Sequence, residues 1–193
     1  MKDIINSLNL KLLIYINSHR SPFLDSIMFT LSSTEVWIPV YIYLLYIIFK
    51  EYKNKSWILM LTLAIMIILS DQLSTYLKIL FKILRPSHES YLKTILYISK
   101  AGPGGLYGYV SSHASNFFSL LIFMLVLLPN KYNWFKYLFT LASLLVAYSR
   151  IYNGVHYPFD VLRGIMLGII IGSIFSFMLK YRILNKSIFL KKN

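Results

Sequence analysis

Residues 149–160, SRIYNGVHYPFD, place an arginine, a histidine and an aspartate between two strongly apolar runs. His156 and Asp160 are four residues apart, so they share a face if a helix begins near 156. A carboxylate that binds one imidazole nitrogen fixes the tautomer and leaves the other nitrogen as a base or nucleophile. The alternative interpretation is a polar loop, in which Asp160 caps a helix and the long Arg150 side chain extends toward water.

A second segment, KILFKILRP at 78–86, carries two cations at the predicted end of a helix. Lys78 and Arg85 are seven residues apart, on one helix face and roughly 10.5 Å apart along its axis. Pro86 disfavours helix at the preceding residue and marks the end. The guanidinium fork and the ammonium can hold a phosphate, unless both side chains only extend from an apolar helix into water. Asp71, seven residues before Lys78, is expected to orient Lys78 or another buried donor.

A third segment, VSSHASNF at 110–117, is a small-residue turn that leads into a helix predicted to start near 114. The free N–H groups of Ser111, Ser112 and His113 at that helix start would bind an anion. His113 at the mouth of such a site could donate a proton. The alternative is an ordinary serine cap beside an interfacial histidine.

The composition indicates which elements must position these residues. The chain has 193 residues, of which 57% are hydrophobic and only 14% charged, whereas a soluble domain carries about 25% charged residues. This favours a single-domain, all-α, polytopic membrane protein. The absence of cysteine excludes disulfides and thiolate metal sites. The net charge of +13 is then better explained by cations that flank membrane spans than by nucleic-acid binding.

Five segments are apolar and long enough to serve as membrane-spanning helices, some by continuing past a polar residue. They are 35–50, 57–81, 114–129, 134–151 and 160–180. The N-terminal region 1–34 lacks a signal-peptide cleavage site and is predicted to form two amphipathic interfacial helices, 3–17 and 22–32. A sixth span within 3–33 is the alternative. The predicted organisation is therefore an N-terminal interfacial region (1–34), a transmembrane domain (35–181) and a basic cytoplasmic tail (182–193).

Five spans also fix which connections share a side of the membrane. The short connections 51–56 and 130–133 and the tail after 180 are rich in lysine and arginine, so they are expected to be cytoplasmic. The connections 86–112 and 151–159 then face outward. This topology brings the chemically capable side chains of the three segments to one side: Lys78, Arg85, His113, Arg150, His156 and Asp160.

Three cations, two histidines and one carboxylate make a poor site for a divalent metal. They make a good phosphate site with a histidine nucleophile. Further cations on the outward side, Lys93, Lys100 and Arg163, could bind a second phosphate or a sugar, or simply anchor the chain at the interface.

The three motifs together resemble the signature of the type 2 phosphatidic acid phosphatase (PAP2) superfamily, over about residues 35–180. The matching residues are Lys78, Arg85, Pro86, Ser111, His113, Ser149, Arg150, His156 and Asp160. The second motif departs from the usual P-S-G-H, because Val110 and Ser112 stand in the proline and glycine places. Ser112 still offers its backbone N–H. The usual lipid phosphatase of this superfamily has six spans, so the sixth is either absent here or lies within 3–33.

The resemblance implies a phosphatase that needs no metal or cofactor. By analogy His156 attacks phosphorus to form a phosphohistidine, and Asp160 orients it. His113 protonates the leaving oxygen and then activates water. The groups that would hold the phosphate are Lys78, Arg85, Arg150 and the backbone N–H groups near Ser111 and Ser112, with Asp71 in a supporting role.

The expected substrate is a lipid in the bilayer whose phosphate lies at headgroup depth. Undecaprenyl diphosphate and lipid A phosphates fit the outward orientation best, and phosphatidylglycerol phosphate and phosphatidic acid are alternatives. The expected location is the bacterial inner membrane, with the active site facing the periplasm or outside. The rival function is a transporter or lipid-binding protein that only binds phosphate. A pure binder needs cations, but it does not need two histidines, one of them beside an aspartate.

Overall fold

The computed structural model describes residues 2–100 and 102–189, and the described part is all-α, as predicted. The α-helices follow the predicted segments closely. They are α1 (Lys2–Ser18), α2 (Pro22–Ser32), α3 (Ile38–Tyr52), α4 (Ser56–Phe81), α5 (Ser112–Leu127), α6 (Asn133–Tyr152) and α7 (Pro158–Phe189). Short 3-10 turns connect several of them, including two in the long connection between α4 and α5, Pro86–His88 and Ser90–Leu92.

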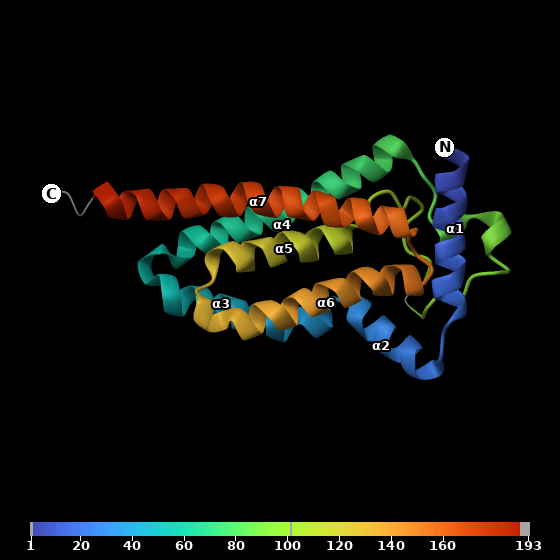
Figure 1. The fold of residues 1–193 in the computed structure, drawn as a ribbon, viewed down its shortest axis with the longest axis horizontal. Helices are drawn as coiled ribbons and strands as arrows, with labels where there is room; N and C mark the ends of the chain where they lie inside the picture. Colours follow the sequence, from blue (N-terminus) through green and yellow to red (C-terminus); the bar gives the residue numbers. More distant parts are fainter. Residues whose placement is uncertain (1, 101, 190–193) are drawn as a thin grey trace.

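Helices α3 to α7 form an elongated bundle (Figure 1). Helix α5 is its centre, because it packs against α4, α6 and α7, while α3 packs against α4. Residues of α5 such as Phe123 and Met124 are fully buried. The motif residues are carried by the ends of α4 and α6 and the starts of α5 and α7, which lie together at one end of the bundle.

Three glycines of α7 allow it to approach the backbone of α5 closely. A Cβ at Gly164 would lie 2.5 Å from the Ser111 carbonyl oxygen, and one at Gly172 would lie 2.7 Å from that of Ser119. A Cβ at Gly168 would collide with the carbonyl oxygen between these two, that of Ser115. Small residues that bring helix backbones together are the usual means of association in lipid, where apolar side chains gain nothing from burial against each other. We call these six residues the Ser–Gly seam.

Two described stretches, Glu35–Phe81 and Pro158–Arg182, are long and apolar enough to cross a membrane. The first contains both α3 and α4, which are separated by a turn at Lys53–Lys55. Helix α5 is apolar but shorter. Large hydrophobic side chains are exposed along the bundle, among them Ile42, Phe49, Ile68, Leu138 and Phe177. These features fit a protein in contact with lipid, and the count of five spans stays a prediction, as do the domain limits.

The two predicted N-terminal helices are confirmed as α1 and α2. Ser21 caps α2 by accepting a hydrogen bond from the Leu24 N–H at 3.3 Å, and Pro22 is the first helical residue. Helix α1 lies across the end of the bundle that carries the motif residues (Figure 1). Neither helix is among the described stretches that could span a membrane.

Two asparagine side chains tie α1 to the bundle: Asn9, whose Oδ1 accepts the Phe159 N–H at 3.0 Å, and Asn17. Asn17, only 2% exposed, donates hydrogen bonds to the carbonyl oxygens of Tyr97 at 2.9 Å and Tyr152 at 2.8 Å. It also accepts one from the Tyr97 N–H at 2.8 Å. These bonds join α1 both to the long connection and to the end of α6, so they fix α1 beside the motif residues.

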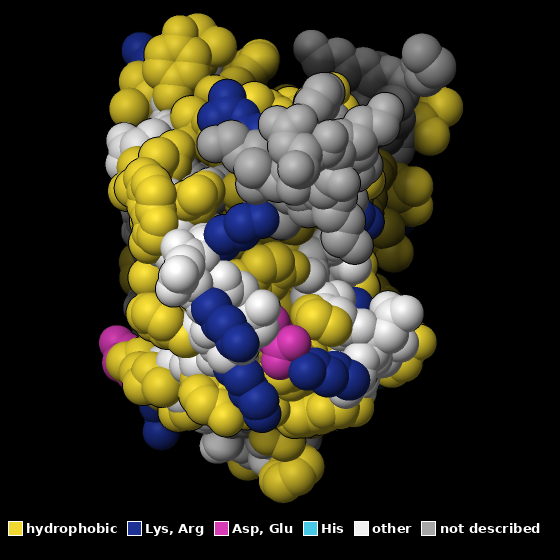
Figure 2. Space-filling model, turned by 90° about the vertical axis from the view of Figure 1, so that its left-hand side faces the viewer, with side chains coloured by type: hydrophobic (Ala, Val, Ile, Leu, Met, Phe, Trp, Pro, Cys, Tyr) yellow, Lys and Arg dark blue, Asp and Glu magenta, His cyan; other side chains and the backbone are white. Residues whose placement is uncertain are grey.

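The opposite end of the bundle is basic (Figure 2). The turns between α3 and α4 and between α5 and α6 lie there, and they carry the lysines at 53, 55 and 131. An ion pair of 2.8 Å joins Lys131 to Glu51 across the two turns. Helix α7 continues to Phe189, so the backbone of the predicted basic tail is helical up to that residue, and 190–193 lie outside the described residues.

Candidate active site

Lysine 78 points from α4 toward the start of α5. Its Nζ donates a hydrogen bond to the Ser112 Oγ. The Ser74 and Ser112 hydroxyls are also hydrogen-bonded, at 2.6 Å, and the Ser70 and Ser115 hydroxyls below them at 2.6 Å. A ladder of small polar side chains therefore fixes the end of α4 against the first turn of α5. The prediction of a free N–H at Ser111 was wrong, because this N–H donates to the Asp160 carbonyl oxygen at 3.0 Å. The free backbone N–H groups that can bind an anion therefore begin at Ser112.

Arginine 85 is positioned by a glycine-containing loop. Helix α4 ends at Lys82, whose φ is +48°, and the chain then runs beside 106–108, where the Arg85 N–H donates to the Leu106 carbonyl oxygen at 3.0 Å. The Arg85 Nε donates to the Tyr107 carbonyl oxygen at 3.2 Å. Burial lowers the pKa of Arg85, and the Asp160 carboxylate opposes that effect.

Two glycines of this loop are functional residues that the motifs did not identify. A Cβ at Gly104 would collide with the Arg85 guanidinium. A Cβ at Gly108 would lie 3.0 Å from the Arg85 Cγ and 3.2 Å from the Asp160 Oδ2. Because neither residue has a Cβ, the backbone of the loop can lie close to Arg85. The glycine-rich run at 102–108 was the sequence feature that could have identified both glycines.

The connection between α6 and α7 holds the histidine and aspartate of the third motif. Two backbone N–H groups, of Val155 at 3.2 Å and His156 at 3.3 Å, donate to the Arg150 carbonyl oxygen and fold the connection back on itself. Gly154, with φ +72°, makes the reversal without strain. The Arg150 Nε is buried and has no hydrogen-bond partner within the described chain. Its guanidinium is therefore available to a ligand.

His156 and Asp160 face each other, but the predicted hydrogen bond is not formed. They are 1% and 2% exposed, and the His156 Nδ1 and the Asp160 Oδ2 are 3.9 Å apart. The prediction of a shared helix face was wrong in detail, because α7 begins at Pro158 and leaves His156 in the preceding connection. The Asp160 Oδ2 instead accepts the Tyr157 N–H at 3.1 Å, as a residue in a first helical turn does. In unliganded enzymes catalytic hydrogen bonds are often this long.

Buried His156 is surrounded by positive charge. Burial lowers the pKa of His156 well below its usual range, and the charges of Arg85, Arg150 and Lys78 lower it further. The imidazole is therefore neutral at physiological pH, as a nitrogen nucleophile must be. The same three cations would attract a phosphate to this nitrogen.

His113 and Asp71 line a cavity of about 210 Å³ that also includes Ser112. The predicted pairing of Asp71 with Lys78 is not formed, because no ion pair joins Asp71 to any cation of the described chain.

Among the further outward cations, Arg163 lies over the Tyr109 ring at 5.0 Å, and Lys100 lines a separate polar cavity of about 480 Å³.

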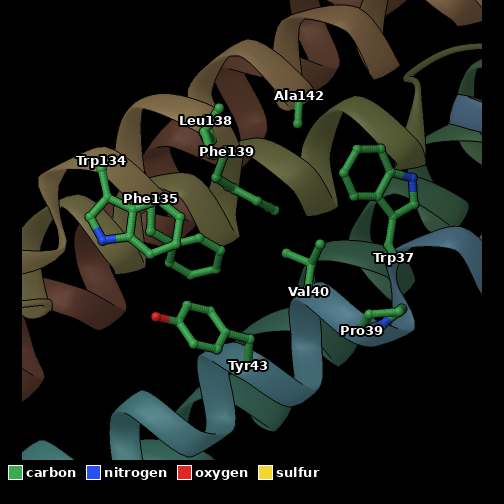
Figure 3. Close-up of a pocket in the computed structure, with 9 residues that line it drawn as sticks. All are labelled: Trp37, Pro39, Val40, Tyr43, Trp134, Phe135, Leu138, Phe139 and Ala142. Carbon is green, nitrogen blue, oxygen red and sulfur yellow. The ribbon is translucent and has the colours of Figure 1, made fainter.

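Another pocket, between α3 and α6, has a volume of about 300 Å³ (Figure 3). Its lining is apolar and aromatic: Trp37, Pro39, Val40, Tyr43, Trp134, Phe135, Leu138, Phe139 and Ala142. It contains none of the motif residues, and none of its lining residues is charged. In the described residues no group of three or more histidine, aspartate or glutamate side chains could hold a metal ion.

Comparison with known proteins gives consistent results. Residues 57–184 match the model of the PAP2 superfamily. The chain is 32% identical over 181 residues to a lipid A 4'-phosphatase of Bacteroides thetaiotaomicron, covering 92% of this chain and 80% of the relative. It is also 32% identical over 163 residues to an undecaprenyl-diphosphatase of Sulfolobus acidocaldarius, covering 83% of this chain and 73% of the relative.

Two solved structures are similar in fold. The crystal structure of Aquifex aeolicus LpxE gives a TM-score of 0.69 with 30% identity, and the match covers 90% of this chain and 96% of that one. A transmembrane PAP2 type phosphatidylglycerolphosphate phosphatase from Bacillus subtilis gives a TM-score of 0.70 with 18% identity over 92% of this chain and 87% of that one.

Proposed function

Because the chain belongs to the PAP2 superfamily and is a membrane-associated lipid phosphatase, we propose that it removes phosphate from a lipid A phosphate or undecaprenyl diphosphate through a phosphohistidine intermediate. The names of the two relatives support these two substrates. The observation that carries the proposed mechanism is the buried, neutral His156, which lies between the Asp160 carboxylate and three cations.

In the first step the His156 Nε2 attacks phosphorus, because the Nδ1 faces Asp160. A nitrogen–phosphorus bond forms, the bond from phosphorus to the bridging oxygen breaks, and His113 gives its proton to that leaving oxygen. Asp160 stabilises the positive charge that develops on the imidazole. The lipid alcohol, or the lipid monophosphate when the substrate is a diphosphate, leaves with the proton.

In the second step His113 takes a proton from water as the water oxygen attacks the phosphohistidine. The nitrogen–phosphorus bond breaks, inorganic phosphate departs and His156 is neutral again. Throughout, Lys78, Arg85, Arg150 and the Ser112 N–H hold the phosphate oxygens, whereas the Ser111 N–H donates to the Asp160 carbonyl oxygen. Fixed donors of this kind stabilise the transition state without reorganisation.

The proposed orientation places this site on the outer side of a bacterial inner membrane. The basic turns at the opposite end of the bundle support it, because short basic connections are retained in the cytoplasm (Figure 2). Helix α1, lying across the site end, would rest in the interface. A cysteine at position 95, the only one in the chain, should react with an impermeant thiol reagent from outside, and labelling only from the cytoplasm would reverse the orientation.

The decisive experiment is phosphate release by the purified protein in mixed micelles with chelator present. A His156→Ala variant should lose release from every lipid phosphate, because the nucleophile is gone. His19→Ala is the matched control, since His19 is exposed at the end of α1. Release that survives His156→Ala would refute His156 as the nucleophile, whereas no release by the wild-type protein would favour the rival function, a phosphate-binding or transport protein.

A further inference from the structure

The cavity beside His113 lies on the side of the site where the leaving group of the proposed reaction must be. Its volume is about 210 Å³. Its lining comes from α2, the α2–α3 connection, α3, α4 and α5, and it includes Asp71, His113 and Asn116. Since His113 protonates the leaving oxygen in that mechanism, the atoms bonded to this oxygen would occupy the cavity.

Two hydrogen-bond acceptors in this cavity lack donors. The half-buried Asp71 carboxylate forms no hydrogen bond or ion pair with any described residue, although Lys78 is near enough for the two charges to attract. The Asn116 Oδ1 is buried and also without a partner. A carboxylate in the middle of an apolar helix is costly unless something pairs with it, and buried polar atoms are nearly always hydrogen-bonded. The cavity is thus built to receive hydroxyl or amide N–H groups.

The cavity becomes apolar with distance from His113. It shares Thr34, Tyr41, Asn116 and Phe117 with a pocket of about 340 Å³ between α3, α4 and α5. The remaining lining of that pocket is leucine and isoleucine: Leu44, Leu45, Leu63, Ile67 and Leu120. The hydrogen-bond acceptors therefore lie near His113, and the hydrocarbon side chains lie farther away. This arrangement matches an amphiphile whose hydrogen-bond donors lie next to the ester oxygen.

We infer that Asp71 and Asn116 select a leaving group that carries hydroxyl or amide donors, as a sugar or glycerol does, and reject a prenyl diphosphate. The inference rests on the proposed function. When the terminal phosphate of a prenyl diphosphate is removed, the leaving group is itself a phosphate. Its negative charge would meet the Asp71 carboxylate, and its isoprene chain would leave both acceptors unpaired.

The test compares kcat/KM on four lipids with chelator present: a glucosamine-based lipid A 4'-phosphate, phosphatidylglycerol phosphate, phosphatidic acid and undecaprenyl diphosphate. The wild type should prefer the first two, whose leaving groups carry donors. Asp71→Asn should lower the ratio of kcat/KM on the preferred lipid to that on undecaprenyl diphosphate by about 10- to 100-fold, as for a hydrogen bond to a charged group. Asn116→Leu should lower the same ratio.

Glu51→Gln is the matched control, because it removes one carboxylate charge at the opposite end of the bundle, and its ratio should equal that of the wild type. A wild-type preference for undecaprenyl diphosphate, or ratios unchanged in both cavity variants, would overturn the inference and leave the phosphatase mechanism intact. Release that persists in His156→Ala would instead overturn the proposed function.

Discussion

Replacing Gly168 with alanine should destabilise the bundle, because this glycine is the tightest point of the Ser–Gly seam. The added Cβ would collide with the Ser115 carbonyl oxygen and lie 3.0 Å from both the Phe118 Cβ and the Ser119 nitrogen. Carbon contacts are ordinarily about 3.5–4.0 Å, so α5 and α7 must separate by roughly 0.5–1 Å. Overpacking of this kind costs about 1–3 kcal/mol, and each kcal/mol lowers Tm by about 2–4 °C for a chain of this size.

The same substitution should lower activity by more than the loss of stability explains. Helix α5 carries His113 in its first turn and α7 carries Asp160 in its first turn, so a shift at Gly168 moves them relative to each other. A misplacement of about 1 Å can cost on the order of 100-fold in rate. We therefore expect kcat to fall about 10- to 100-fold at temperatures where the variant remains folded.

The assay is phosphate release from a lipid phosphate in micelles, together with a thermal unfolding curve. Gly105→Ala is the control, because a Cβ at Gly105 meets no atom within 4 Å. A Gly168→Ala protein with the Tm and kcat of the wild type would refute the reasoning. Equal losses in the Gly105→Ala protein would also refute it.

Three further predictions concern the site and its support. Asp160→Asn keeps the size of the side chain but removes the charge 3.9 Å from the His156 Nδ1, so kcat should fall about 10²- to 10⁴-fold with little change in Tm. Asn17→Leu leaves buried backbone groups of Tyr97 and Tyr152 unpaired, which should cost about 1–3 kcal/mol of stability and lower Tm. An unchanged Tm would show that Asn17 does not anchor α1. Because burial lowers the pKa of His156, its imidazole stays neutral below its ordinary pKa of about 6.5, and the acid limb of kcat/KM should lie below that pH. An acid limb at or above pH 6.5 would contradict this.

Helix positions were predictable from the sequence because they depend on local periodicity and apolar length. The ends of α4 and α5 fall within two residues of their predicted limits, and the signals were local: Pro86 after the first and the serine turn before the second. The gathering of Lys78 and His113 at one end of the bundle followed from the number of passes alone. Because consecutive helices run in opposite directions, their alternation is enough to sort residues between the two ends of the bundle.

Other features depend on contacts between distant segments and could not be predicted. The hydrogen bonds of Asn17 join residues 80 and 135 positions apart in the chain. Asp71 was expected to orient Lys78 or another buried donor, but Lys78 donates to the Ser112 Oγ, which belongs to the serine ladder. The long connection 82–111 has no periodicity, so the approach of Gly108 to Asp160 appears only in three dimensions.

The Ser–Gly seam gives α7 two faces with different tolerance to mutation. On the outer face any apolar side chain contacts lipid tails about equally well, so sequence drift there is nearly neutral. On the seam a single added methyl group changes the helix spacing, so residue size is limited to that of glycine and serine. The seam thus fixes the spacing between α5 and α7 at the catalytic end. Over evolutionary time the lipid-facing surface can be replaced while the distance between the two histidine-bearing segments is preserved.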